Sequence, residues 1–167
     1  MSLCVSLLTS IYLNLLTRRA TSSPEQHYEQ LVAGTSLDPK DVQAAFDNLQ
    51  PVSPDLFIGA WKGANVNTNH PTEAKLTGMR WAGKTFRSTE DVDPIMVYDE
   101  DDKRTWNADW GHARLRQIEW NGKLSTAMVY DDFPIIDYFR YVRDDLIAGA
   151  MDAKTASGGT YYFYLYK

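Results

Sequence analysis

From residue 56 to the C-terminus, short segments rich in aromatic and β-branched residues alternate with clusters of turn residues. This pattern predicts strands joined by tight connections. The expected strands are 57–62, 81–87, 95–98, 112–120, 123–131, 135–142, 146–152 and 160–166. Asn121-Gly122 lies between two of them, and both residue types accept the positive φ angles of a two-residue hairpin. Consecutive antiparallel strands in this number close most economically into a barrel, so we expect a mainly β meander closed on itself.

Both faces of several expected strands carry apolar residues. In 135–142, for example, one face carries Asp137 and Phe139, and the other carries Tyr138 and Val142. A barrel that is covered in part by helices needs apolar residues on both faces. The alternation therefore predicts covering helices, but it leaves open which face of each strand points inward.

Two short helices are expected before the strands. Ser23 is a suitable N-cap, Pro24 suits the first helical position, and Gln26 completes a capping box with Ser23. Asp38-Pro39 repeats the start signal, and an apolar stripe follows it as far as the next proline.

The apolar segment Met1–Leu16 is shorter than the about 20 residues of a membrane-spanning helix, so we expect no stable membrane span. Three interpretations stay open: an amphipathic helix that packs on the domain or on a partner, a targeting segment, or a poorly ordered leader. We divide the chain into an N-terminal helical extension or leader, 1–35, and a single barrel domain, 36–167. We expect a cytoplasmic protein, with a homodimer as an open alternative.

The composition excludes several classes of function. A formal net charge of -5 argues against binding nucleic acid, which needs a basic surface. The single cysteine, Cys4, excludes an internal disulfide framework and a cysteine-built zinc site. With three histidines in the chain we expect no metal, although an Asp/His site stays open. Signatures of nucleophile elbows, phosphate loops, dinucleotide sites and zinc proteases are absent from the sequence.

A set of spaced motifs resembles the GXWXG family and the domain of unknown function that commonly follows it. The resemblance extends from about Leu49 to the C-terminus. The matching motifs are Gly59-Ala60-Trp61-Lys62-Gly63, His70-Pro71, Trp81-Ala82-Gly83-Lys84-Thr85-Phe86, Ala113-Arg114-Leu115-Arg116, Ala127-Met128-Val129-Tyr130-Asp131, Pro134-Ile135 and Phe163-Tyr164-Leu165. The resemblance implies a small lipocalin-like (calycin-like) barrel without a recognised cofactor, and it brings no established activity. Ala82 replaces a tyrosine that is common in the family, which would enlarge or dry a pocket near Trp81.

Polar residues within the aromatic strands are the candidates for chemistry. We select His70, Lys84 and Tyr130 as catalytic candidates. His70 is either a loop histidine bonded to the backbone or an acid/base group at the barrel mouth. Lys84 either pairs with a carboxylate or polarises a ligand oxygen from inside a pocket. The candidate ligand-binding residues are Trp61, Trp81, Met128, Asp137, Phe139 and Met151.

An eight-stranded barrel has space for filling side chains or for one small ligand, so these aromatic residues are either core or ligand wall. Two functions fit a hydrophobic small-molecule partner. One is a cofactor-free cyclase or isomerase, with a pericyclic reaction as one form, acting on a terpenoid or polyketide-like substrate. The other is a non-catalytic carrier or sensor. A protein-interaction module that uses the N-terminal segment is a third class. We expect Lys84→Met and His70→Ala to change stability by at most about 1 kcal/mol.

Overall fold

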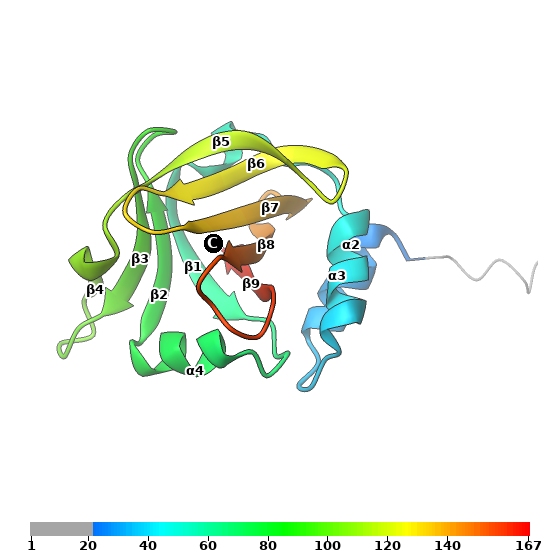
Figure 1. Cartoon of the computed structure of the whole chain (residues 1–167), viewed down its shortest axis with the longest axis horizontal. Helices are drawn as coiled ribbons and strands as arrows, with labels where there is room; N and C mark the ends of the chain where they lie inside the picture. The colour runs from blue at the N-terminus through cyan, green and yellow to red at the C-terminus, as the bar shows by residue number, and fades with distance from the viewer. Residues whose placement is uncertain (1–21) are drawn as a thin grey trace, which may run out of the picture.

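The chain is described by a computed structural model that covers residues 22–167, so the apolar segment Met1–Leu16 and its three interpretations lie outside the described residues. Eight strands form a closed antiparallel barrel in the order β2-β1-β9-β8-β7-β6-β5-β3, and β3 pairs with β2 to complete the ring. Figure 1 shows the barrel with helices on one side and at one end. The predicted closed β meander is confirmed.

Each predicted strand is present with small shifts at its ends. The barrel strands are β1 (Gly59–Asn65), β2 (Trp81–Phe86), β3 (Val92–Tyr98), β5 (Ala113–Trp120), β6 (Lys123–Tyr130), β7 (Ile135–Arg143), β8 (Leu146–Ala153) and β9 (Tyr161–Tyr166). A short additional strand, β4 (Arg104–Trp106), pairs with β3 outside the ring and was not predicted. The first strand starts later than expected, because Ser53 caps a 3-10 turn, η1 (Pro54–Phe57).

The hairpin between β5 and β6 has the predicted turn. Asn121 and Gly122 have φ angles of 49° and 73°, and Trp120 is opposite Lys123. Both central residues occupy the left-handed region that this kind of tight turn requires. The local sequence therefore fixes the register of this strand pair.

The two predicted helices are α2 (Pro24–Val32) and α3 (Pro39–Asn48). The capping box of Ser23 and Gln26 forms as expected. Both helices lie on one side of the barrel (Figure 1), where Tyr28 and Phe46 are buried against outward-facing residues such as Tyr138. This packing explains why the strands need apolar residues on both faces.

A third helix, α4 (Pro71–Gly78), lies across one end of the barrel in Figure 1 and was not predicted. Its N-cap is His70, and Glu73 completes the capping box. Histidine is not among the usual N-cap residues, which is why the pattern read as a loop. None of the helices in residues 22–167 has the length and apolar character of a membrane span.

The barrel interior holds a second apolar cluster that surrounds Trp61. The Trp61 side chain is fully buried, packs beside Phe57, and donates a hydrogen bond of 2.6 Å from Nε1 to the Phe57 carbonyl oxygen. Phe139 and Phe163 extend this cluster from β7 and β9. The interior is therefore filled around Trp61, and other members of this cluster, such as Phe163 and Tyr130, line a cavity beside it.

Candidate functional site

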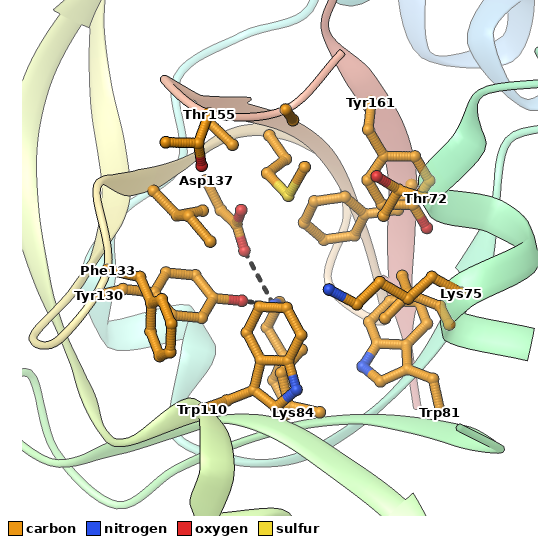
Figure 2. A pocket seen from close by; sticks show the side chains of 17 residues that line it. Thr72, Lys75, Trp81, Lys84, Trp110, Tyr130, Phe133, Asp137, Thr155 and Tyr161 are labelled. Atoms are coloured by element: carbon orange, nitrogen blue, oxygen red, sulfur yellow. Dashed lines mark hydrogen bonds and ion pairs between the residues drawn. The ribbon is translucent and has the colours of Figure 1, made fainter. Parts of the chain in front are cut away.

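A cavity of about 310 Å³ lies inside the barrel, with residues of α4 and of the connection between β8 and β9 in its lining. Its walls are mostly apolar, and they include Trp81, Trp110, Phe133 and Phe163. Figure 2 shows Trp81, Trp110 and Phe133 arranged around the space, with the polar groups of the site among them. A mostly apolar space with a few placed polar groups is the usual form of a small-molecule site.

The polar centre of the cavity is an ion pair between strands that are not neighbours. Lys84 of β2 places Nζ 2.8 Å from Oδ2 of Asp137 on β7, and both side chains are 2% exposed. The Nζ group also donates to the Pro94 carbonyl oxygen at 3.0 Å and to the Tyr130 hydroxyl at 3.4 Å. Three contacts thus fix the position of the ammonium group.

Asp137 keeps unused hydrogen-bonding capacity. Lys84 occupies Oδ2 as its ion-pair partner, whereas within residues 22–167 the other carboxylate oxygen, Oδ1, accepts no hydrogen bond. Burial raises the pKa of the Asp137 carboxyl, and the positive charge of Lys84 and its hydrogen bond to the carboxylate lower that pKa in part. A buried acceptor without a partner is costly, so Oδ1 can take a hydrogen bond from a ligand.

Tyr130 is the second buried acid of the site. Burial, followed by the negative charge of Asp137, raises the pKa of the Tyr130 phenol well above its usual value. The phenol therefore keeps its proton and can act as a hydrogen-bond donor.

Aromatic rings surround the Lys84 ammonium group. Nζ lies 5.1 Å from the ring centroid of Phe163 and 5.7 Å from those of Trp81 and Tyr130. Rings within about 6 Å attract a cation through their electron-rich faces. The site is therefore built to hold a positive charge next to Asp137.

The second glycine of the Gly-Trp motif makes room for a cavity wall. A Cβ atom on Gly63 would lie 2.3 to 2.6 Å from ring atoms of Trp81. Real Cβ atoms are never that close to another heavy atom, so only glycine allows the Trp81 ring its position. Gly59, the first glycine, has open space around it, but its φ angle is +116°. Glycine is favoured there because residues with a side chain rarely adopt such a backbone conformation.

The mouth of the cavity carries a second lysine. Lys75 of α4 is exposed, and its Nζ lies 4.5 Å from the ring centroid of Trp110. Figure 2 shows this amine pointing over the space between Trp110 and Trp81. Trp81 Nε1 is buried and has no hydrogen-bond partner among the described residues. The mouth can therefore offer donors to a polar end of a ligand.

His70 is not among the residues that line the cavity. Its Nδ1 accepts a hydrogen bond from the backbone N–H of Thr72, and Nε2 is 3.2 Å from the Gly159 carbonyl oxygen. The second contact requires the Nε2–H tautomer, because a carbonyl oxygen only accepts. His70 thus links the start of α4 to the β8–β9 connection, which is the backbone-bonded alternative of the sequence analysis.

The structure brings together only part of the predicted site. Trp81, Lys84, Tyr130, Asp137 and Met151 line the cavity. The other ligand-binding candidates, which do not line it, are fully buried in the interior cluster: Trp61, Met128 and Phe139.

Sequence reasoning missed several lining residues, among them Lys75, Trp110, Phe133, Tyr161 and Phe163. Tyr161 and Phe163 could have been found, because they alternate along a predicted strand and share one face. Lys75 lies on the helix that was not predicted. Trp110 and Phe133 follow no periodic pattern, since they lie in connections between strands.

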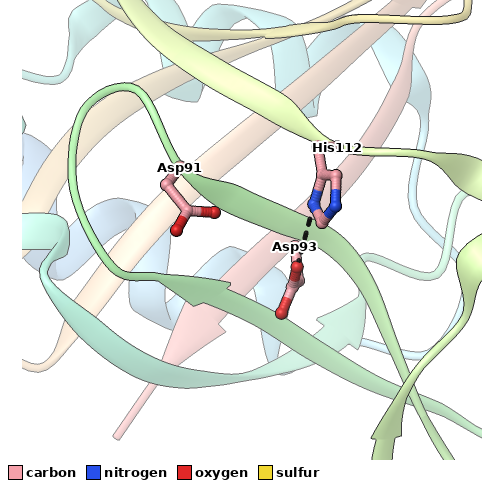
Figure 3. A group of neighbouring side chains, drawn as sticks. All are labelled: Asp91, Asp93 and His112. Atoms are coloured by element: carbon pink, nitrogen blue, oxygen red, sulfur yellow. Dashed lines mark ion pairs between the residues drawn. The ribbon is translucent and has the colours of Figure 1, made fainter.

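A separate cluster on the outside contains Asp91, Asp93 and His112, whose potential ligand atoms lie within 4.8 Å of one another (Figure 3). Arg87 already binds both carboxylates, with hydrogen bonds of 2.6 to 2.8 Å to Asp91 and Asp93. His112 adds a contact of 3.1 Å to Asp93 and stacks on Trp106. The guanidinium group occupies the oxygen atoms that a metal ion would need, so we assign this cluster a structural role.

Comparison with known proteins agrees with the motifs. The model described as "GXWXG protein" matches residues 44–102, and the model of a domain of unknown function, DUF4334, matches residues 111–167. A crystal structure of a protein from Thermomonospora curvata is 35% identical in sequence, and the match covers 87% of this chain and 99% of that chain with a TM-score of 0.81. No curated protein matches this chain.

Proposed function

This chain belongs to the family that joins a GXWXG segment to a DUF4334 domain, and from that premise we propose that its barrel is a cofactor-free cyclase or isomerase. The substrate is one small, mostly apolar molecule with an oxygen function, of terpenoid or polyketide-like character. The observation that carries the proposal is the buried pair of Lys84 and Asp137 at an apolar cavity.

The cavity volume limits the size of the ligand. Benzene fills an engineered cavity of about 150 Å³, so the present cavity suits a body of about 12 non-hydrogen atoms. This is the size of a small terpenoid, and it is too small for a long polyketide chain unless part of the chain remains outside the mouth.

Each polar residue has a distinct role in this proposal. Tyr130 donates a hydrogen bond to the ligand oxygen, and Lys84, which is held by Asp137 and Pro94, places its positive charge beside that oxygen and so draws electrons from the reacting carbon framework. Asp137 holds Lys84 in place and accepts a hydrogen bond or a proton. Trp81 and Met151 form walls that select the reactive conformer, and such positioning contributes up to about 7–11 kcal/mol in the best intramolecular cases. His70 positions the β8–β9 connection and does not touch the ligand.

A carrier or sensor is the alternative function, and the same cavity would support it. The ion pair favours the enzyme. Burying two charges is costly, and a carrier of an apolar cargo would not need them, because an apolar cavity alone would bind that cargo. The two functions differ in whether the ligand leaves unchanged.

Two probes with the same ring system, one with and one without a hydroxyl, test the binding site. We expect 2-naphthol to quench tryptophan fluorescence on binding, and naphthalene, which lacks the hydroxyl, to bind more weakly. The double variant Lys84→Met/Asp137→Leu removes both charges and should lose this preference, whereas Lys62→Met on the outside should keep it. Equal affinity of wild type for the two probes would contradict the polar role of the pair.

The reaction itself is tested with the natural ligand. Native mass spectrometry of protein isolated from its own host should identify a bound small molecule. Incubation of that molecule with fresh protein, followed by chromatography, should yield an isomer of equal mass that the double variant does not produce. Recovery of only unchanged molecule would favour the carrier.

A further inference from the structure

Lys84 has the surroundings of a reactive amine. Its Nζ faces an internal cavity, lies 2.8 Å from a carboxylate oxygen of Asp137, and is held at 3.0 Å by the Pro94 carbonyl oxygen. A neutral lysine amine is a nucleophile toward carbonyl carbon. Asp137 is placed to remove the proton that Lys84 must lose first.

We propose that Lys84 forms an imine with an aldehyde or ketone ligand in the cavity, so that the substrate class is a small apolar carbonyl compound. This inference rests on the proposed function, since it assumes that the ligand binds in this cavity. In the proposed function Lys84 acts on the ligand without a covalent bond, and this inference adds a covalent bond between Lys84 and the ligand.

The step balances with Asp137 as the only proton carrier. Asp137 takes a proton from the Lys84 ammonium, and the nitrogen lone pair then attacks the carbonyl carbon. The carbonyl π electrons move to oxygen, which takes the proton back from Asp137 and becomes a hydroxyl. Asp137 next removes a second proton from nitrogen and delivers it to the hydroxyl, which leaves as water with its electron pair. The nitrogen lone pair closes the C=N bond, so an ammonium and a carbonyl become a protonated imine and water.

The groups around Lys84 stabilise the protonated imine in the same way as they stabilise the free ammonium. The protonated imine carries the same positive charge as the ammonium, and that charge stays between Asp137 and the rings of Trp81, Tyr130 and Phe163. The charge would draw electrons out of a conjugated ligand, which facilitates isomerisation or ring closure. Addition of water reverses the sequence and frees the lysine.

The other lysine at the cavity lacks these features. Lys75 is exposed at the mouth, lies over Trp110, and has no carboxylate partner among residues 22–167. It therefore lacks both the adjacent carboxylate base and the burial that surround Lys84. Lys75 therefore serves as an internal comparison for the reactivity of Lys84.

The main test uses the full wild-type chain. Protein is incubated with substoichiometric 2-naphthaldehyde, reduced with sodium cyanoborohydride, and analysed by intact mass and peptide mapping. We expect one adduct per chain, located on Lys84, and competition by 2-naphthol. Because the cavity holds the aldehyde against Nζ, labelling of Lys84 should be at least about ten-fold faster than labelling of exposed Lys62 or Lys75.

The outcomes separate the two proposals. If 2-naphthol binds but reduction labels Lys75 and Lys62 while Lys84 stays unmodified, the imine is wrong and the proposed binding site stands. If neither 2-naphthol nor the aldehyde binds, both fail. The variant Lys84→Met/Asp137→Leu should lose the mapped adduct and keep the circular dichroism spectrum of the wild type, which excludes labelling of a neighbouring residue.

Discussion

Lys84 and Asp137 meet inside the barrel at 2.8 Å although they come from strands β2 and β7, which do not pair with each other. Both side chains are almost completely buried. A buried pair depends on both partners, because the loss of one leaves an uncompensated charge in the interior.

Replacing Lys84 alone should therefore be strongly destabilising. We expect Lys84→Met to lower the free energy of unfolding by about 3–5 kcal/mol near neutral pH. The double variant Lys84→Met/Asp137→Leu should recover most of this loss. Urea denaturation of the three proteins gives the comparison. A single variant as stable as wild type would mean that Asp137 is not charged in the native state. The expectation of at most about 1 kcal/mol applies to a residue outside packed regions, whereas Lys84 is buried and paired.

The stability lost in Lys84→Met should depend on pH. Burial gives Asp137 a raised pKa in the folded protein, so its protonated form stabilises the fold at low pH and that contribution is lost as pH rises through the folded-state pKa. Without Lys84 the pKa rises further. The difference in stability between wild type and Lys84→Met should therefore widen from pH 4.5 to pH 7.5. The surface carboxylates are the same in both proteins, so their titration cancels in this difference. A difference that stays constant with pH would exclude Asp137 as the titrating group.

Gly63→Ala should change the cavity. The new methyl group collides with the Trp81 ring. To relieve the collision, the ring must leave its position in the cavity wall. We expect destabilisation of about 1–3 kcal/mol from overpacking, together with weaker binding of 2-naphthol. Gly59→Ala is the control: it strains the backbone but meets open space, so it should lower stability and leave affinity unchanged. Binding curves that coincide for Gly63→Ala and wild type would show that Trp81 does not shape the site.

Trp61→Ala should cost about 3–5 kcal/mol, because a fully buried ring is removed and a cavity remains. Trp106→Ala should cost less, since that side chain is 38% exposed. The midpoints of urea denaturation measure both. Similar midpoints for the two variants would argue against Trp61 as the centre of the interior cluster.

Gly122→Ala should cost about 1–2 kcal/mol through backbone strain alone, because its φ angle is 73° and nothing lies within 4 Å of the added methyl. Gly78→Ala also adds a methyl in open space, but at the end of helix α4 with an ordinary φ angle. That change should be neutral or stabilising by up to about 1 kcal/mol. Equal effects of the two substitutions on thermal unfolding would contradict the left-handed turn.

His70→Ala should lower stability by about 1 kcal/mol, because the N-cap of α4 is lost. His70→Asn keeps a capping side chain and should recover most of that loss. Both variants lose the contact with Gly159, so amide exchange in the β8–β9 connection should speed up in each. Unchanged exchange in both would remove His70 as the link between α4 and this connection.

The sequence was most informative where structure depends on neighbours in the chain. Turn residues such as Asn121-Gly122 and caps such as Ser23 act within a few residues, so strands, hairpin and the first helices were predicted. The motif around Trp61 placed the chain in its family. The same local logic failed at α4, where His70 fills a position that other residues usually occupy.

The site was decided only by the tertiary structure. Alternation along β7 separates Asp137 from Tyr138 but does not say which one faces the interior; the helices packed on Tyr138 settle it. The partner of Lys84 and the need for glycine at position 63 also depend on side chains from other strands. Local sequence sets φ and ψ preferences over a few residues, whereas contacts across a closed barrel follow from the register of all its strands together.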